Sequence, residues 1–147
     1  MGTNTVYLAE KGFEVTGIDI SPTAIKYAKK KASEANVKIH FIVQDFLQLH
    51  FENEEFDLIY DMGCFHYVEP EDRTNFIKGI YRILKKVGNY MLTCFSYRNG
   101  RSWNYLTKGK LINLFSLCFD LGKFRHYSSV EDDEVIRYFY TVLMKKK

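Results

Sequence analysis

The spacing of hydrophobic and polar positions predicts helices and strands that alternate along the chain. In four segments apolar residues recur every three or four positions, as on one face of a helix. The segments between them are short, apolar and rich in β-branched residues, as in buried strands. The predicted helices cover residues 4–11, 21–35, 70–86 and 106–118. The predicted strands cover residues 14–20, 37–43, 56–61, 89–97, 119–129 and 135–147.

Residues at the ends of the helical segments support these assignments. Gly12 follows the first segment and Gly88 follows the third, and glycine commonly ends a helix. Ser21 and Pro22 suit the N-cap and the first position of the second helix. Thr107 suits the cap of the fourth. The predicted boundaries therefore rest on cap chemistry as well as on periodicity.

Two strands in succession end the chain. The acidic turn 131–134 joins them, so one of the two runs antiparallel. The alternating order before them indicates a parallel sheet with helices on both faces. We therefore predict an α/β fold, a three-layer Rossmann-like sheet that is mostly parallel and has an antiparallel C-terminal hairpin. No internal repeat or low-complexity linker divides residues 1–147, which are predicted to form a single domain.

Composition narrows the class of protein. Of the 147 residues, 46% are hydrophobic and 16% aromatic, which is enough to form a core. The net charge of +3 is small and the basic residues are dispersed, which argues against a nucleic-acid partner. No apolar run is long enough to cross a membrane. The three cysteines form no Cys-x-x-Cys pair and the four histidines have no metal-ligand spacing, which favours a metal-free cytoplasmic protein.

Carboxylates stand at the ends of three successive predicted strands. Ligands of open parallel sheets bind beyond the carboxyl ends of the strands. Asp19, Asp45 and Asp61 lie there, where a carboxylate can accept hydrogen bonds from sugar hydroxyls or an exocyclic amine. Asp19 also lies 17 positions after Gly2 (19 − 2), close to the spacing of a ribose-binding acid after a glycine turn. Together the three carboxylates indicate a nucleoside site. Taken singly, Asp19 could instead cap the following helix, and Asp45 could instead order a turn.

At these residues the sequence resembles the class I S-adenosylmethionine-dependent methyltransferases. The segment GTNTVYLAEKGFEVTGIDIS is similar to the end of the family's motif I, its first helix and its ribose-binding strand. VQDFLQL is similar to the adenine-contacting segment, and FDLIYDMGCFHYV to motif IV. The last helix and hairpin, with the string DMGCFH, most resemble small-molecule enzymes of the thiopurine and tellurite-resistance type. The resemblance implies methyl transfer from S-adenosylmethionine to a small-molecule acceptor by in-line displacement.

The resemblance also implies roles for individual residues. The implied cofactor site consists of Gly2, Thr3, Asn4, Asp19, Ile20, Ser21, Asp45, Phe46, Asp61, Met62 and Gly63. The implied acceptor pocket consists of His66, Tyr67, Tyr97 and Trp103. Asp61 and His66 are the candidate catalytic bases for an acceptor that must lose a proton. A structural hydrogen bond to the backbone is the alternative for His66, and loop packing is the alternative for Tyr97 and Trp103.

The chain departs from the family pattern at its beginning. The family's motif I is a first strand and a Gly-x-Gly-x-Gly turn, of which only Gly2 is present. That strand lies at the centre of the family's sheet, between the strands that we predict at 14–20 and 56–61. Three explanations stay open: a longer natural protein, a shortened relative that serves as a binding module, and a split or swapped enzyme. In the last case a homodimer or a partner chain covers the edge left by the missing strand.

Two other function classes remain. A nicotinamide-dependent oxidoreductase would also use Asp19 for a ribose, but the antiparallel hairpin and the strand-end motifs disfavour it. A non-catalytic interaction protein on the same scaffold would fold stably and have no affinity for the cofactor.

Overall fold

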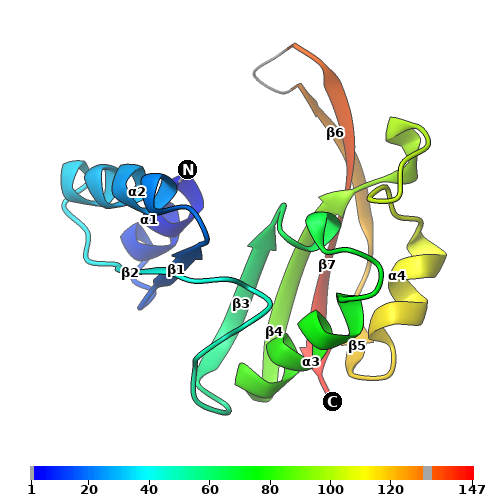
Figure 1. Cartoon of the computed structure of the whole chain (residues 1–147), viewed down its shortest axis with the longest axis horizontal. Coiled ribbons are helices and arrows are strands. Elements are labelled where there is room, and N and C mark those ends of the chain that lie inside the picture. Colours follow the sequence, from blue (N-terminus) through cyan, green and yellow to red (C-terminus); the bar gives the residue numbers. More distant parts are fainter. Residues whose placement is uncertain (1, 131–133) are drawn as a thin grey trace. The chain divides into compact units, whose positions relative to one another are not determined.

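The computed structural model describes residues 2–130 and 134–147, which form two compact units. The first unit spans Met1–His50 and the second Phe51–Lys147. Their helices and strands follow the predicted order, except that one predicted strand is divided in two (Figure 1). The predicted acidic turn lies, apart from Glu134, outside the described residues.

The first unit consists of two helices and a two-stranded sheet. Its elements are α1 (Thr3–Glu10), β1 (Thr16–Asp19), α2 (Pro22–Glu34) and β2 (His40–Val43). β1 and β2 pair in parallel, and α2 packs on both. Ser21 caps α2 as predicted, because its hydroxyl accepts a hydrogen bond from the Ala24 N–H at 3.2 Å. The buried stripe of α2 consists of Ala24, Ile25, Ala28 and Ala32, and these mostly small side chains allow close packing.

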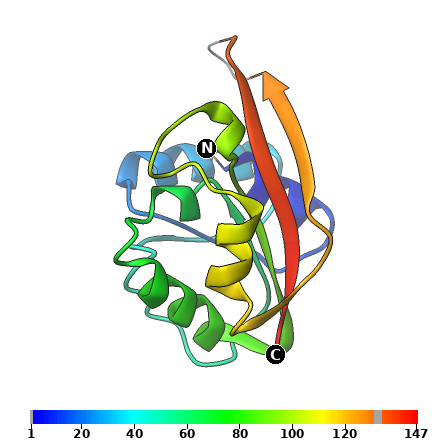
Figure 2. The ribbon, with the colours of Figure 1, turned by 90° about the vertical axis from the view of Figure 1, so that its right-hand side faces the viewer.

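The second unit is a sheet with helices on one face. Its strands are β3 (Phe56–Met62), β4 (Leu84–Phe95), β5 (Phe119–Leu121), β6 (Arg125–Val130) and β7 (Ile136–Lys146). Its helices are α3 (Arg73–Ile83) and α4 (Lys108–Phe115), with short 3-10 turns η1 (Phe65–Tyr67) and η2 (Tyr97–Asn99). The strand order is β3-β4-β7-β5, with β6 also paired to β7. β3 and β4 are parallel, whereas β7 is antiparallel to its neighbours, which confirms the predicted C-terminal hairpin. Figure 2 shows α3 and α4 on the same side of this sheet.

The core of the second unit lies between β4 and these helices. Tyr90 on β4 is fully buried, with ring centroids 5.8 Å from Phe115 and 6.0 Å from Phe119. Phe65 lies 5.0 Å from Phe115 and joins the turn after β3 to this cluster. Aromatic burial of this kind contributes strongly to stability. The cluster therefore holds the carboxyl end of β3 and the turn that follows it.

The third predicted helix is shorter than expected. The periodicity predicts a helix through residue 86, but α3 ends at Ile83 and β4 begins at Leu84. The register between β3 and β4 shifts near Leu58, so residues after Leu84 form an irregular bulge that ends at Gly88. A Cβ on Gly88 would lie 2.9 Å from the Lys85 carbonyl oxygen, so the backbone can turn this tightly only at glycine.

The predicted strand 119–129 is divided into β5 and β6. The break falls at residues 122–124. A Cβ on Gly122 would lie 2.7 Å from the Leu143 carbonyl oxygen, so the chain passes β7 here at a distance that only glycine allows. Alternation of apolar residues does not reveal such a break, because both parts face the same partner strand.

β1 and β3 do not pair with each other. β1 belongs to the two-stranded sheet and β3 to the five-stranded one, and each has one paired neighbour within residues 2–130 and 134–147. Each therefore has an open edge of backbone N–H and C=O groups. These are the two strands between which the family resemblance predicts a further strand.

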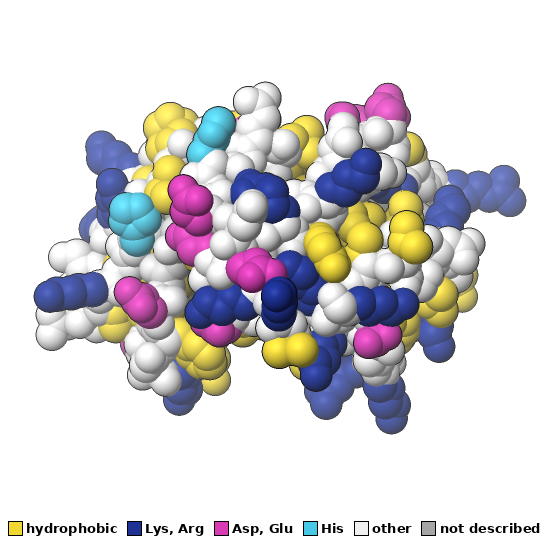
Figure 3. Space-filling model, turned by 90° about the horizontal axis from the view of Figure 1, so that it is seen from below, with side chains coloured by type: hydrophobic (Ala, Val, Ile, Leu, Met, Phe, Trp, Pro, Cys, Tyr) yellow, Lys and Arg dark blue, Asp and Glu magenta, His cyan; other side chains and the backbone are white. Residues whose placement is uncertain are grey.

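Charges are mixed on the surface. On the face shown in Figure 3, lysine and arginine side chains lie among acidic and hydrophobic ones, without a single basic patch. None of the described helices is long and apolar enough to span a membrane. In the described part of the chain no group of three or more His, Cys, Asp or Glu side chains is arranged to hold a metal ion.

Candidate functional site

The N-terminus of α1 packs closely on α2. Gly2 is the N-cap of α1 and has φ 74°, in the left-handed region. A Cβ at this position would lie 2.7 Å from the Ala28 Cβ and 2.8 Å from the Ala28 Cα. Gly2 is thus needed both for its backbone conformation and for this contact. No side chain caps α1, so its first turn can present backbone N–H groups to a ligand.

Asp19 ends β1 beside this helix terminus. Its Oδ1 accepts a hydrogen bond from the Ser21 N–H at 2.9 Å, which orders the turn into α2. Its Oδ2 has no partner in the part of the chain that the structure describes. A pocket of about 60 Å³ brings the two features together; it is lined by Gly2, Thr5, Gly17, Ile18, Asp19, Ala24, Ile25, Ala28 and Phe41. Ile20, next along the chain, is 62% exposed.

The end of β2 lies beside the end of β1. The Gln44 N–H donates to the Asp19 carbonyl at 3.0 Å, which extends the pairing by one residue. Asp45 follows, and its Oδ1 accepts from the Leu47 N–H at 2.8 Å. The predicted turn-ordering role of Asp45 is therefore present. One carboxylate oxygen is used in this turn, as it is at Asp19, and the other is available for a ligand.

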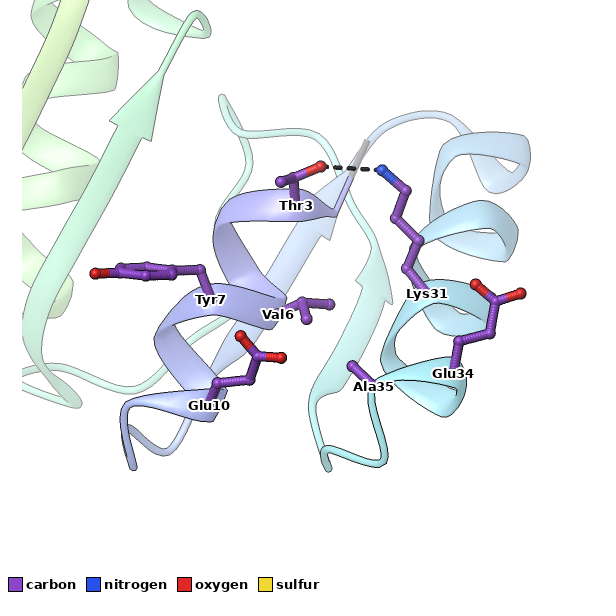
Figure 4. Close-up of a pocket in the computed structure, with 7 residues that line it drawn as sticks. All are labelled: Thr3, Val6, Tyr7, Glu10, Lys31, Glu34 and Ala35. Carbon is purple, nitrogen blue, oxygen red and sulfur yellow. Dashed lines mark hydrogen bonds between the residues drawn. The ribbon is translucent and has the colours of Figure 1, made fainter.

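A larger groove lies between α1 and α2. Its volume is about 490 Å³, and it is lined by Thr3, Val6, Tyr7, Glu10, Lys31, Glu34 and Ala35 (Figure 4). The Lys31 ammonium donates to the Thr3 hydroxyl at 2.9 Å across it. Of the predicted site residues only Thr3 belongs to this groove, and Asp19 does not. Sequence reasoning missed the groove, because nothing in the pattern distinguishes Lys31 from its lysine neighbours.

Asp61 organises the turn after β3 in the second unit. Its Oδ1 accepts from the Cys64 N–H at 2.8 Å, and its Oδ2 from the Phe65 N–H at 3.2 Å and the Tyr90 hydroxyl at 2.8 Å. The side chain is buried, and this burial raises the pKa of Asp61, while the three hydrogen bonds act in the opposite direction. Both carboxylate oxygens thus bind donors of the same chain. Its predicted part in proton transfer stays a prediction.

His66 lies against the same turn. Its Nδ1 accepts a hydrogen bond from the Phe95 N–H at 3.2 Å, and its ring stacks on the Phe95 ring at a centroid distance of 4.0 Å. Burial lowers the pKa of His66 from 6.5 to about 4, so the ring is neutral at pH 7. A Cβ on Gly63 would lie 3.7 Å from His66 Cε1. The alternative predicted for His66, a hydrogen bond to backbone, is therefore present in the structure.

The other predicted acceptor residues lie in the same unit and are exposed. Tyr67 is 60% exposed, Tyr97 50% and Trp103 45%. Tyr67 contacts His66, with ring centroids 4.5 Å apart. Cys64 is exposed as well, whereas Cys94 is buried and its pKa is raised to about 12, mainly by burial, which makes that thiol unreactive.

Sequence reasoning missed Arg73. Its guanidinium is buried in the second unit and donates to the Val68 carbonyl from Nε at 3.2 Å and to the Trp103 carbonyl from Nη2 at 3.4 Å. Arg73 thereby ties together the loops after β3 and β4, which carry all four predicted acceptor residues. The available signal was its place on the apolar face of α3, at helical spacing from Phe76 and Ile77.

Comparison with known proteins decides the family. A family model described as "Methyltransferase domain" matches residues 1–88, a range that extends across the boundary between the two units. The chain belongs to this methyltransferase family. The predicted class of S-adenosylmethionine-dependent methyltransferases is thus confirmed, and S-adenosylmethionine is the methyl donor of that class.

Individual relatives agree with this assignment. An uncharacterized methyltransferase of Schizosaccharomyces pombe is 34% identical over 96 residues, which cover 65% of this chain and 66% of the relative. The human EEF1A lysine methyltransferase 2 is 32% identical over 130 residues, covering 82% and 50%. The chain thus spans about half to two thirds of the length of these relatives.

A solved structure shows the same fold. It is the 1,6-didemethyltoxoflavin-N1-methyltransferase of Burkholderia thailandensis with bound 1,6-didemethyltoxoflavin and S-adenosylhomocysteine. The match has a TM-score of 0.77 at 20% identity and covers 99% of this chain and 67% of that one. It confirms the predicted Rossmann-like methyltransferase fold.

Proposed function

We propose that this chain transfers a methyl group from S-adenosylmethionine to a small molecule. One observation carries the proposal: the uncapped N-terminus of α1 and the available Oδ2 of Asp19 meet at the same pocket. A helix N-terminus favours a carboxylate, and a strand-end acid accepts from ribose hydroxyls. S-adenosylmethionine carries both groups, the carboxylate on its methionine part and the ribose hydroxyls on its adenosine part.

The chain's own residues take the following roles in this proposal. Gly2, Thr3 and Asn4 face the amino-acid end of the cofactor; Asp19, Ile20 and Ser21 hold the ribose; Asp45 and Phe46 bind the adenine; Asp61, Met62 and Gly63 line the methyl end. When bound, the cofactor would supply an electrophilic methyl group, which the acceptor takes by in-line attack as the methyl–sulfur bond breaks and S-adenosylhomocysteine leaves. The protein aligns the two reactants and excludes water.

We propose further that a strand from elsewhere completes the sheet. The pocket at Asp19 has a volume of about 60 Å³, smaller than a cavity of about 150 Å³ that holds benzene, and is thus too small for a nucleoside. The open edges of β1 and β3 each offer backbone groups to a further strand. Residues of a longer protein that precede those given, a second copy of the chain or a partner chain would supply it.

Hydrogen exchange tests the open edge of β3. Because the Gly63 N–H bonds to the Thr93 carbonyl on β4, the Leu58 and Tyr60 N–H groups point toward the opposite edge. In an isolated monomer these two amides exchange quickly, whereas that of Ile59, which points toward β4, is protected. Equal protection of all three amides shows that a further strand is already paired with β3. Fast exchange at Ile59 as well would contradict the β3–β4 pairing itself.

A calorimetric titration of S-adenosylhomocysteine tests the cofactor site. We expect Asp19→Asn to weaken binding by about 10- to 100-fold, the effect of losing hydrogen bonds to a charged group. The amide oxygen introduced by this substitution can still accept from the Ser21 N–H, so the turn persists. The matched control is Glu14→Gln, which removes one negative charge at an exposed position of the same unit. An unchanged affinity in Asp19→Asn would limit Asp19 to capping the turn.

A non-catalytic binding module is the second candidate. The observation in its favour is the pair of open strand edges, which suit a protein partner as well as a completing strand. It predicts a folded chain to which S-adenosylhomocysteine does not bind. A preference for a nicotinamide dinucleotide in the same titration would instead support the disfavoured oxidoreductase. We place the protein in the cytoplasm, a proposal that rests on an odd number of cysteines without a Cys-x-x-Cys pair.

A further inference from the structure

The hydrogen bond to His66 Nδ1 arises where β3 ends. Alternate residues of β4 direct their backbone groups toward β3. Thr93 does so, because its carbonyl accepts from the Gly63 N–H at 3.2 Å. Phe95 is the next residue on that side, and β3 has ended at Met62. His66 Nδ1 accepts from the Phe95 N–H in place of the missing strand carbonyl.

This bond determines which ring nitrogen carries the proton. A neutral imidazole has one protonated nitrogen and one acceptor nitrogen. Since Nδ1 accepts from a backbone N–H, Nδ1 carries no proton and Nε2 is protonated. A base acting through Nε2 would need the opposite tautomer, and the Nδ1 proton would then meet the Phe95 N–H. The geometry therefore makes His66 a hydrogen-bond donor.

Nε2 is available for a ligand. His66 has no hydrogen bond other than the one from Phe95 in the described part of the chain. No buried side-chain nitrogen or oxygen among the described residues lacks a partner, so Nε2 is not sealed inside the protein. The ring as a whole is only 3% exposed, and its orientation is held by stacking on Phe95.

The side chains around His66 are largely aromatic. Tyr67 lies 4.5 Å from His66 between ring centroids, and Tyr105 packs edge-on against Phe95 at 5.7 Å. Gly63, with no side chain, faces the Cε1 edge of the imidazole. A donor N–H among aromatic rings matches a planar molecule that carries an accepting oxygen or nitrogen.

We propose that His66 binds and orients the methyl acceptor through its Nε2–H and does not remove the acceptor's proton. The acceptor would be a planar small molecule with a carboxylate, carbonyl or phenolate oxygen, or a ring nitrogen, next to the atom that is methylated. This inference rests on the proposed function for its setting, but its tests need neither the cofactor nor turnover.

The tautomer is tested first. Long-range ¹H–¹⁵N spectra of ¹⁵N-histidine-labelled chain at pH 7 report which ring nitrogen is protonated. The signal of His66 is assigned by its loss in His66→Gln. We expect a protonated Nε2 and an unprotonated Nδ1. The opposite tautomer, or rapid averaging between the two, would overturn the inference.

Two variants then separate donation from anchoring. Glutamine places its amide N–H near the position of Nε2, whereas asparagine places its oxygen near that of Nδ1, where it can still accept from Phe95. Benzoate is the probe, because it is planar and has accepting oxygens, and toluene is the matched probe without them. Binding is followed by shifts of the His66 Nε2 signal in the wild type and of the Trp103 indole signal in the variants.

The two variants give opposite results if His66 donates. We expect His66→Gln to bind benzoate within about twofold of wild type and His66→Asn about tenfold more weakly, with toluene equal in both. Loss in both variants, or in His66→Gln alone, would indicate an anchoring role only and refute donation. Failure of wild type to prefer benzoate over toluene would refute the acceptor class. Neither result depends on S-adenosylhomocysteine, so a failure of the proposed function is seen separately.

Discussion

Lowering the pH from 7 to 5 is expected to destabilise the second unit through His66. In the folded chain the pKa of His66 is lowered to about 4 by burial, against 6.5 for an ordinary histidine. Between these two values the unfolded chain binds a proton at this position and the folded chain does not. Stability therefore increases with pH in this window and is lost as the pH falls through it.

The size of the effect follows from the two pKa values. A difference of about 2.5 between them corresponds to about 3.4 kcal/mol when the pH is below both. Between pH 7 and pH 5 the linkage relation gives about 1.8 kcal/mol of that total. The side chain is 3% exposed, so solvent screening does not reduce this figure much. A loss of this size is a large part of a small domain's stability.

Urea unfolding followed by tryptophan fluorescence measures this loss. The protein's one tryptophan, Trp103, belongs to the second unit and reports its unfolding. His66→Gln cannot titrate and should lose about 1.8 kcal/mol of the difference in unfolding free energy between pH 7 and pH 5. His50→Gln, an exposed histidine of the first unit, should keep the wild-type difference. If His66→Gln keeps the wild-type pH dependence, the argument for a neutral, buried ring is refuted.

Three further substitutions test contacts on which the two units depend. Gly2→Ala should destabilise the first unit by about 1–3 kcal/mol, because the added Cβ would collide with Ala28 and the backbone φ is positive. Gly12→Ala is the control, since Gly12 has φ 88° and open space around it, so this variant shows the cost of the backbone conformation alone. Equal losses of stability in the two variants, measured by circular dichroism, would refute the collision with Ala28. Tyr90→Phe should lower the free energy of unfolding by about 1–3 kcal/mol, because buried Asp61 loses the hydrogen bond from the Tyr90 hydroxyl. The control is Tyr127→Phe, at an exposed tyrosine, which should not change the free energy of unfolding measured in urea. Arg73→Met should shift the Trp103 emission and speed proteolysis of the loops after β3 and β4, whereas exposed Arg101→Met should not.

Most of the fold could be predicted because caps and periodicity agree. Ser21 caps α2 and Thr107 caps α4, whose Lys110 N–H donates to the Thr107 hydroxyl at 3.2 Å. The errors lie where close backbone approach decides the structure. The apolar pattern continues from Ile83 into Leu84, so nothing in it marks the change from helix to strand. Gly122 is needed because of the Leu143 carbonyl, far away in sequence, and Gly88 because its own bulge turns tightly against the Lys85 carbonyl.

The candidate site was predicted less completely, because its chemistry depends on tertiary contacts. The strand-end positions of Asp19, Asp45 and Asp61 follow from the order of elements. The donors that occupy Asp61 do not, since Tyr90 lies 29 positions away. The bond from Phe95 to His66 spans the same separation. Arg73 was missed because its two partners are backbone carbonyls, which leave no mark in a sequence.

These contacts bear on how the proposed reaction can proceed. Asp61 binds three donors of its own chain, and His66 uses its one free lone pair on the Phe95 N–H. Each group that the sequence offered as a base is thus engaged in holding the turn after β3. Methyl transfer from a sulfonium needs no base when the acceptor atom already has a lone pair available for attack on the methyl carbon. The arrangement therefore suits an acceptor that is nucleophilic when it binds, such as a thiolate, a phenolate or an unprotonated ring nitrogen, with the protein contributing orientation and a dry surface.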